Sequence, residues 1–410
     1  MSAQVLDFPP RAARRPEPSS GPPRPLDIRH VAVADGLGHP SGANGVHNVA
    51  RALVREQREA GDAASLVLLA RGEVALDAAP DCPTRVLQLG WPVLRGRNLR
   101  VASATLDALL AGAGRRTLCH IHGGREPMLP GLGRSLRRRG VPYAITVHGR
   151  FSHVYDPEGR TLKRSTALYL RLLERSLLEG ARFVQALSAE EAAILHRIAP
   201  YARIEVIGNG AYSTRLGATP AAPLPRSRSE SFPHFGYCGR YAIEHKGLDL
   251  LLEGFALHCR AGGAGRLTMM GSGPARAELE ALAAALGIAG RVRVLGPQFG
   301  AARDSLLRDC DFFVMASRYE GLPLAGIEAA LLGLPLIVTA GSGLRAAVTA
   351  QGAGVPIERH TAESVAAALH HAAALTPAAW QAQAAAAHAM VLKEGDWSGI
   401  AARLRAAYLE

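Results

Sequence analysis

Short apolar runs alternate with amphipathic segments along this chain, and this alternation limits the fold more than any other feature. In the first half, apolar runs that predict strands occupy residues 28–34, 64–69, 117–121, 143–147, 183–187 and 203–207. Segments with helical spacing lie between the earlier runs, at 46–60, 98–112, 130–139 and 161–179. Strands that alternate with helices form a mostly parallel sheet with helices on both faces. The first half is therefore predicted to be a doubly wound α/β domain.

The alternation stops after Asn209-Gly210 and restarts at His234. Residues 213–233 are rich in Pro, Ser and Arg and show no periodicity, as is typical of a linker. Because 410 residues exceed what one core usually holds, two domains are expected. The second half predicts strands at 234–238, 266–270, 292–295, 311–315 and 336–339, with helices at 247–260, 274–287 and 324–332.

The predicted organisation has five parts. These are a disordered tail over 1–26, a first domain over 27–205, a linker over 206–233, a second domain over 234–380 and a helical end over 381–410. Ligands of doubly wound sheets bind at the carboxyl ends of the strands. We therefore expect a site in a cleft between two Rossmann-like domains.

Composition argues against several classes of protein. The five cysteines are scattered singly without C-x-x-C spacing, so neither a zinc knuckle nor a redox motif is expected. The N-terminus lacks the apolar stretch of a signal peptide, and no uninterrupted run of about 18 apolar residues suggests a membrane span. A cytoplasmic location is the expectation.

The net charge of +12 indicates anionic partners. The densest basic cluster consists of Arg134, Arg137, Arg138 and Arg139, three of which share one helical face. This face is either simply solvated or contacts acidic lipid headgroups or a pyrophosphate-bearing acceptor, which would place the protein on the inner face of the cytoplasmic membrane. Aromatic residues do not interleave with the basic ones, so nucleic acid is not an expected partner.

The segment Ser317–Pro335 is the strongest chemical motif. It places Glu320 in a loop after a buried strand and Glu328 in the helix that follows. The first amides of that helix, at Leu324 and Ala325, would direct N–H groups and the positive end of the helix dipole at an anion such as a diphosphate. Glu328 would suit the two hydroxyls of a ribose. The alternative is that both glutamates only cap the helix and face solvent.

A second motif covers 235–248, where a strand ends at Gly239 and Lys246-Gly247 opens the next helix. Arg240 and Lys246 could converge on a leaving phosphate, unless they are ordinary surface charges.

The first predicted strand is followed by the loop Ser41–Gly45, whose glycines would let the backbone at Asn44 and Gly45 approach a ligand. His120, His122 and His148 end two further strands. They are either metal ligands or satisfied loop histidines, and no carboxylate with clear metal-ligand spacing accompanies them.

In order and spacing, these segments resemble the large group of retaining GT-B glycosyltransferases marked by an E-x7-E motif. Glu320 and Glu328 match the two glutamates, and Arg240 with Lys246 matches the G-R…K-G pair. Further matches are the strand-end turn Gly271-Ser272-Gly273-Pro274, the motifs Ala186-Leu187-Ser188 and Asn209-Gly210, the pair His148-Gly149, and the glycine loop at 41–45. The resemblance runs from about Ile28 to the end and is more specific in the second half.

The resemblance implies a role for each matching residue. Arg240 and Lys246 would bind the diphosphate of a UDP- or GDP-sugar, together with the turns at Gly239, Gly271 and Gly273. Glu320 would contact the transferred sugar and Glu328 the ribose, while His148 would hydrogen-bond the sugar from the opposite domain and Asn44 and Gly45 would lie near the phosphates. It also implies transfer without a metal or other cofactor, a saccharide or lipid-linked acceptor in envelope polysaccharide or lipopolysaccharide assembly, and a helix within 381–410 that returns to the first domain.

Three positions depart from the family pattern. Pro323 replaces a frequent Gly, Tyr212 a frequent Asp, and Arg345 a frequent acid. These departures bear on the identity of the donor more than on the predicted fold. Two other functions also stay open, a GT-B sugar phosphorylase or epimerase and a catalytically silent binding or scaffold subunit.

Overall fold

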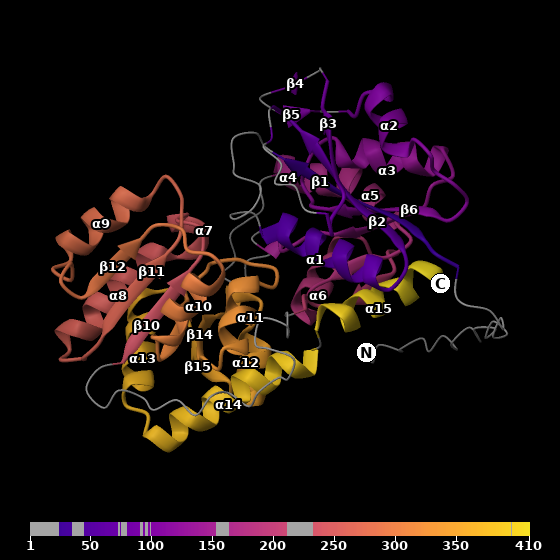
Figure 1. Ribbon diagram of the computed structural model, residues 1–410. Coiled ribbons are helices and arrows are strands. Elements are labelled where there is room, and N and C mark those ends of the chain that lie inside the picture. Colours follow the sequence, from indigo (N-terminus) through magenta and orange to yellow (C-terminus); the bar gives the residue numbers. More distant parts are fainter. Residues whose placement is uncertain are drawn as a thin grey trace, which may run out of the picture.

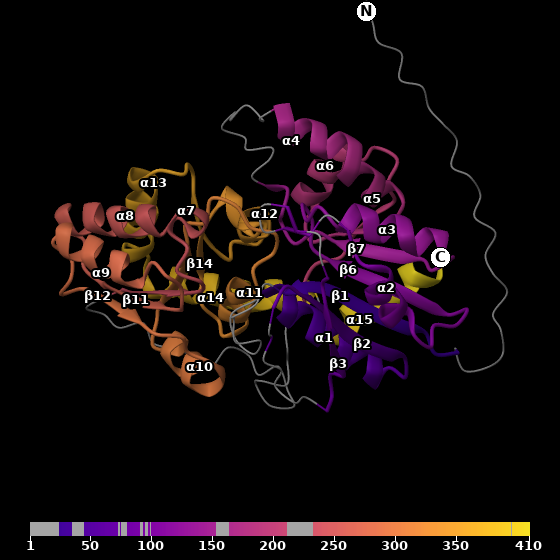
Figure 2. The ribbon, with the colours of Figure 1, turned by 90° about the horizontal axis from the view of Figure 1, so that it is seen from above.

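The computed structural model describes residues 24–34, 45–72, 74, 80–90, 93–94, 97–98, 100–152, 164–210, 233–394 and 396–410. Two lobes lie side by side, one from each half of the chain, and the last two helices run along both (Figures 1 and 2). Each lobe contains a sheet whose strands are all parallel. This arrangement confirms the predicted α/β fold class.

The sheet of the first domain has the strand order β3-β2-β1-β6-β7-β8-β9. Its strands are β1 (Asp27–Ala34), β2 (Ala63–Ala70), β3 (Thr84–Gln88), β6 (Thr117–His122), β7 (Tyr143–Thr146), β8 (Val184–Ala186) and β9 (Ile204–Val206). A separate antiparallel pair joins β4 (Val93–Leu94) to β5 (Arg97–Asn98). The helices are α1 (Gly45–Glu59), α2 (Ser103–Leu110), α3 (Leu129–Arg138), α4 (Arg164–Tyr169), the π-helical turn η2 (Leu170–Glu174), α5 (Arg175–Glu179) and α6 (Ala189–Ile198).

The sheet of the second domain has the order β12-β11-β10-β13-β14-β15. Its strands are β10 (His234–Cys238), β11 (Arg266–Met270), β12 (Val292–Leu295), β13 (Phe312–Met315), β14 (Leu336–Thr339) and β15 (Gly354–Ile357). The helices are α7 (Ile243–Lys246), α8 (Leu248–Arg260), α9 (Arg276–Ala285), α10 (Gly300–Arg308), α11 (Leu324–Leu331), α12 (Arg345–Gln351) and α13 (Ala362–Ala373), with the short 3₁₀ turn η4 (Ala340–Ser342).

Helix α14 (Pro377–Glu394) packs on the second domain, against α11 and α12, whereas α15 (Trp397–Leu409) packs on α1 of the first. Trp397, Ile400, Leu404 and Tyr408 join the same buried cluster as β1 and α1. Figure 1 shows the two helices passing beneath one lobe and then the other. None of the helices within the described ranges is long and apolar enough to cross a lipid bilayer.

Several elements differ from the sequence-based expectation. Helix α2 begins at Ser103, later than predicted, because Arg97–Asn98 pairs with β4. The predicted helix over 161–179 contains a π-helical turn between α4 and α5. Strands β3 and β15 and helices α6, α10 and α12 were not predicted. Most of the predicted tail and linker, at 1–23 and 211–232, lies outside the described residues.

Candidate active site

The middle of the second sheet is the point at which its strand order reverses. Strands β10 and β13 are neighbours there, while their following helices leave in opposite directions along the sheet. A crevice at such a point, beyond the carboxyl ends of the strands, is where doubly wound sheets bind ligands. Lys246 follows β10 and Glu320 follows β13, so the fold brings the two predicted motifs to this place.

Lys246 and Glu320 form an ion pair between Nζ and Oε1, and both side chains are largely buried. Ser317 Oγ donates to the same carboxylate oxygen at 3.0 Å. His245 Nε2 lies 3.8 Å from Glu320 Oε2, and burial lowers the pKa of His245 to about 4 even though Glu320 opposes this shift. The histidine is therefore neutral at pH 7, and Lys246 is the cation that balances Glu320.

The structure corrects the local setting of Lys246. The sequence predicted that Lys246-Gly247 opens a helix, but Lys246 ends the short α7 and Gly247 separates it from α8. Gly247 has a left-handed φ of 59°, which a residue with a side chain rarely adopts. This break turns Lys246 away from the axis of α8 and toward the loop after β13.

Arg240 lies at the rim of this cluster. Its side chain is exposed, and Nη2 lies 3.3 Å from His245 Nδ1, so His245 stands between Arg240 and the Lys246–Glu320 pair. The predicted glycine turns lie alongside: Gly239 N donates to Met270 O at 3.0 Å, and Tyr241 N donates to Ser272 O at 2.8 Å. These bonds hold the turn after β10 against the turn at Gly271–Gly273.

Helix α11 begins at the predicted anion site. Pro323 O accepts the amides of Gly326 and Ile327, at 3.2 and 3.3 Å. Among the described residues, the amides of Leu324 and Ala325 have no hydrogen-bond partner, which leaves two donors at the positive end of the helix dipole.

An arginine from α10 holds the side chain of Glu328 in α11. Its Oε2 accepts from Arg303 Nη1 at 2.5 Å, and Arg303 also pairs with Asp304 at 2.7 Å. The Glu328 carboxylate is about a quarter exposed. It can therefore accept further hydrogen bonds while α10 holds it in place through Arg303.

The first domain contacts this site at the loop that carries Glu320. Gly149 has a φ of 72°, and a Cβ there would lie 2.1 Å from Gly321 N, so the two backbones touch. Ser152 Oγ donates to Glu320 O at 3.1 Å, and Asn209 Nδ2 donates to Leu322 O at 2.7 Å. The His148-Gly149 turn therefore lies directly against the Glu320 loop.

Glu191 fixes that turn. Its carboxylate accepts from Gly149 N at 2.6 Å and from Leu187 N at 2.7 Å, and Ser188 Oγ accepts from Glu191 N at 3.2 Å. The last of these bonds caps α6, and the bond from Leu187 N ties the residue before the N-cap to the same glutamate. The matched segment Ala186-Leu187-Ser188 is thus tied to the His148-Gly149 turn by a buried carboxylate.

The histidines predicted as strand-end residues form a stack in the first domain. His30 joins His120 and His122, and the ring nitrogens of these three approach within 4.8 Å of one another. Burial lowers the pKa of His30 to about 4 and the pKa values of His120 and His122 well below the usual value. Each ring nitrogen already has a hydrogen-bond partner, such as His122 Nε2 for His30 Nδ1 at 2.8 Å.

The predicted glycine loop can be placed only in part. Asn44 lies outside the described residues, while Gly45 begins α1 and is exposed.

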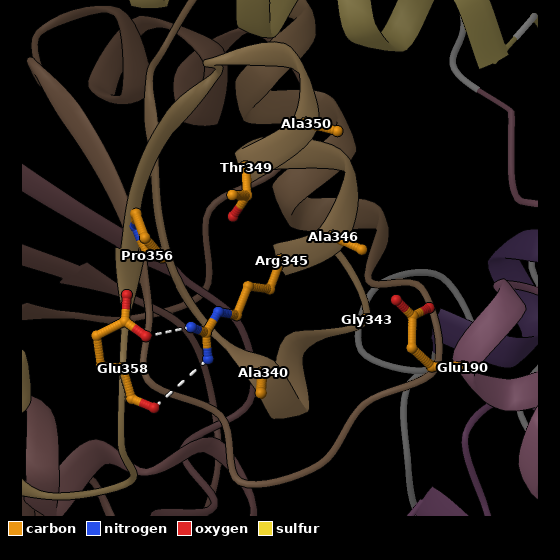
Figure 3. Close-up of a pocket in the computed structure, with 9 residues that line it drawn as sticks. All are labelled: Glu190, Ala340, Gly343, Arg345, Ala346, Thr349, Ala350, Pro356 and Glu358. Atoms are coloured by element: carbon orange, nitrogen blue, oxygen red, sulfur yellow. Dashed lines mark hydrogen bonds and ion pairs between the residues drawn. The ribbon is translucent and has the colours of Figure 1, made fainter.

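A pocket of about 460 Å³ lies beside the Glu320 loop, between the second domain and the start of α6. Figure 3 shows Arg345 pointing to Glu358, with which it forms an ion pair, and Glu190 on the opposite wall. Gly343 lines the pocket and packs against Gly321 O. The unusual Arg345 therefore lines this neighbouring hollow.

The basic cluster lies on the exposed side of α3, whose other side buries Leu132 and Leu136. Arg139 pairs with Asp107 at 2.7 Å, and Arg137 Nη1 donates to Ser176 O at 3.3 Å. Arg134 and Arg138 are exposed and have no polar partner among the described residues.

Four residues at the site were not predicted: His245, Arg303, Ser317 and Glu191. Only Glu191 had a local signal, since it stands three residues after Ser188, the spacing of a capping box. His245 and Arg303 contact partners that are distant in the sequence, and Ser317 contacts Glu320 of its own loop without a motif that marks it.

Comparisons with known proteins bear on the family and the fold. The family model described as "Glycosyl transferases group 1" matches residues 232–374, and the "Glycosyl transferase 4-like domain" matches 44–210. A 2-deoxystreptamine glucosyltransferase of Streptomyces kanamyceticus is 29% identical over 215 residues, which are 50% of this chain and 54% of the relative. The chain spans about half the length of the curated relatives it matches.

Two solved structures share the fold. Sucrose-phosphate synthase from Thermosynechococcus elongatus has a TM-score of 0.71 and 20% identity, over 93% of this chain and 98% of that one. The Anabaena protein HepE, solved with UDP and glucose, has a TM-score of 0.67 and 17% identity, over 93% and 98%. With both halves matched in sequence and the GT-B fold matched along nearly the whole chain, this protein belongs to the group 1 glycosyltransferases.

Proposed function

We propose that this protein moves a sugar from a nucleoside-diphosphate sugar to a saccharide or lipid-linked acceptor, with retention at the anomeric carbon. The observation that carries the proposal is the Lys246–Glu320 pair at the point where the strand order of the second sheet reverses. Lys246 and the two amides at the start of α11 would bind the diphosphate of the donor. Glu320 would face its sugar. UDP is the first candidate nucleotide, because the similar HepE structure was solved with UDP and glucose.

In the reaction, the bond from the sugar C1 to the diphosphate oxygen would break and a bond from the acceptor oxygen to C1 would form, while the hydroxyl proton of the acceptor would pass to the departing diphosphate. Lys246, Arg240 and the amides of Leu324 and Ala325 would stabilise the negative charge that develops on the leaving diphosphate. Glu320 would stabilise the positive charge at the sugar ring, and Glu328, held by Arg303, would accept the ribose hydroxyls. Because Lys246 is paired with Glu320 before the donor binds, the phosphate would have to compete for it.

We place the reaction on the cytoplasmic side of the envelope, in polysaccharide or lipopolysaccharide assembly. The exposed basic face of α3 supports an acidic, lipid-linked acceptor there. Arg134 and Arg138 are available for such a contact.

Thermal unfolding with UDP, GDP, ADP and CDP tests the donor site. A nucleotide at 100 times its Kd should stabilise the fold by about 2.7 kcal/mol, and Lys246→Ala should abolish that shift. Incubation with the matching nucleotide sugars and an acceptor then tests transfer, and product NMR reports the anomeric configuration. Nucleotide binding without transfer would favour the scaffold alternative, and sugar-phosphate release with inorganic phosphate would favour a phosphorylase. The absence of any nucleotide effect would contradict the proposal.

A further inference from the structure

A chain of buried hydrogen bonds connects Gln57 on α1 to His148 at the contact between the domains. Gln57 Oε1 lies 2.8 Å from His30 Nε2, and His30 Nδ1 lies 2.8 Å from His122 Nε2. His122 Nδ1 then lies 3.0 Å from His148 Nε2. Gln57, His30 and His122 are at most 2% exposed, so water does not compete for these bonds.

The three imidazoles are neutral. Burial lowers the pKa of His30 to about 4, that of His122 well below the usual value, and that of His148 to about 3. A neutral imidazole has one N–H and one lone pair, so each ring must accept on one side and donate on the other. The whole chain can therefore point in only one of two directions, and Gln57 sets which one.

A second chain of buried hydrogen bonds runs through His120, beside the first. Tyr408 OH bonds His120 Nδ1 at 2.5 Å, and His120 Nε2 bonds Thr146 Oγ1 at 2.7 Å. Thr146 Oγ1 donates to Gln185 Oε1 at 2.6 Å, and Gln185 Nε2 donates to Ile207 O at 2.8 Å. The carbonyl at the end can only accept, so every hydrogen in this chain points from Tyr408 toward Ile207.

Gln57 sets the direction of the first chain. Its Oε1 atom faces His30 Nε2 at 2.8 Å, and an amide oxygen can only accept, so Nε2 of His30 carries the hydrogen. His30 Nδ1 then accepts from His122 Nε2–H, and His122 Nδ1 accepts from His148 Nε2–H.

We propose that Gln57, His30 and His122 are positioning residues that hold His148 as the tautomer with hydrogen on Nε2 and a lone pair on Nδ1. Nδ1 has no hydrogen-bond partner within the described part of the chain, and in this tautomer it accepts a hydroxyl hydrogen. That the hydroxyl belongs to the transferred sugar rests on the proposed function, whereas the tautomer does not.

The same histidines do not form a convincing metal site. Every nitrogen of His30, His120 and His122 is already hydrogen-bonded, and a cation would have to break these bonds without a carboxylate among the three to balance its charge.

The direct test is ¹⁵N NMR of histidine-labelled protein in the absence of substrate. The His148 signals should show a protonated Nε2 and an unprotonated Nδ1. His122→Phe keeps a stacked ring but removes the acceptor, so His148 should become a mixture of tautomers. His120→Phe is the matched control: it is as buried and stacked but lies in the other chain, and His148 should keep its tautomer.

Gln57 provides a second, milder test at the far end of the chain. Gln57→Met should make His148 a mixture of tautomers. Gln57→Glu, which still accepts from His30, should keep the single tautomer with hydrogen on Nε2. A mixed or Nδ1–H tautomer in the parent protein, an equal effect of His120→Phe, or a stoichiometric metal ion in the purified protein would each overturn the proposal.

Kinetics separate this proposal from the proposed function. His122→Phe should lower kcat about tenfold, and adding it to His148→Ala should cost nothing further, because both changes act through one ring. Additive losses would show that His122 acts independently of His148, which would overturn the positioning role. If the NMR results hold but His148→Ala leaves transfer intact, the tautomer control stands and the catalytic role of His148 fails.

Discussion

Lys246, at the end of α7, and Glu320, in the loop after β13, lie 74 residues apart in the sequence and form an ion pair beyond neighbouring strands of the second sheet. The pair leaves neither charge uncompensated while no donor is bound. In the proposed function, the cation would serve the diphosphate of the donor and the carboxylate would serve its sugar.

Arg240 is predicted to stabilise the leaving diphosphate. Arg240→Ala should lower kcat about a hundredfold, because it removes about 3 kcal/mol of transition-state stabilisation. The melting temperature should stay unchanged, since the side chain is exposed and its bond is to His245. Arg260→Ala, at the exposed end of α8, is the matched control. Turnover in Arg240→Ala equal to that of the control would remove Arg240 from the site.

Transfer is predicted to need no divalent ion. In the proposed site, Lys246, Arg240 and the amides at the start of α11 would supply the positive charge that the diphosphate needs. The initial rate should therefore be the same in excess EDTA as in added Mg²⁺ or Mn²⁺. A rate that disappears in EDTA and returns with either metal would contradict this prediction.

The exposed face of α3 is predicted to bind acidic membranes. Binding to vesicles that contain an anionic phospholipid should be measurable in low salt and weaken as ionic strength rises, because salt screens exposed charges. Replacing Arg134 and Arg138 by Gln should reduce it, whereas replacing the exposed Arg293 and Arg308 of the second domain should not. Equal binding to neutral vesicles would argue against an electrostatic contact.

Glu174 predicts a pH dependence of stability that is separate from catalysis. Burial raises the pKa of Glu174 to about 7, although Tyr169 and the backbone of Arg125 hydrogen-bond its Oε1. Because the folded pKa lies above the unfolded value, the folded state holds its proton more tightly. The resulting stabilisation is full below pH 4.5 and is lost as pH rises toward 7.

The loss should approach about 3 kcal/mol between these limits. Denaturant unfolding of the parent protein and of Glu174→Gln across this range measures it, and the variant should lack this part of the slope. Parallel pH profiles for the two proteins would show that Glu174 does not titrate as described.

The sequence predicted the parts of the site that local patterns define. Glu320, Lys246 and the start of α11 stand at loop ends and helix starts that hydrophobic periodicity locates. The family match confirms the recognition based on these segments. The roles of the individual residues stay predictions.

Contacts between distant segments could not be predicted in this way. Arg303 of α10 meets Glu328 of α11 only in the folded chain, and no motif marks Arg303. In the sequence, Gln57 is an ordinary helix residue and His30 an ordinary strand residue. Only the packing of α1 against β1 brings their side chains together. Strand β15 was missed because Gly354 and Pro356 are unfavourable in strands, and it is tolerated as the edge of the sheet.

The last prediction separates the two glutamates. Glu328, on a helix and held by Arg303, should bind the ribose equally in the ground and transition states. Glu328→Ala should therefore raise the donor KM about tenfold and leave kcat nearly unchanged. Glu328→Gln, which still offers an oxygen to Arg303, should raise it less.

Glu320 should act mainly in the transition state, where positive charge develops on the sugar ring. Glu320→Gln keeps an acceptor for Lys246 and Ser317, so the fold should persist while kcat falls about a hundredfold. Initial rates of each variant against a varied donor decide the matter, because the two changes should differ in kind as well as in size. If Glu320→Gln changes only KM and Glu328→Ala only kcat, the roles are exchanged. If neither parameter moves in either variant, both glutamates are structural, and the Lys246–Glu320 pair is not the place where the sugar is transferred.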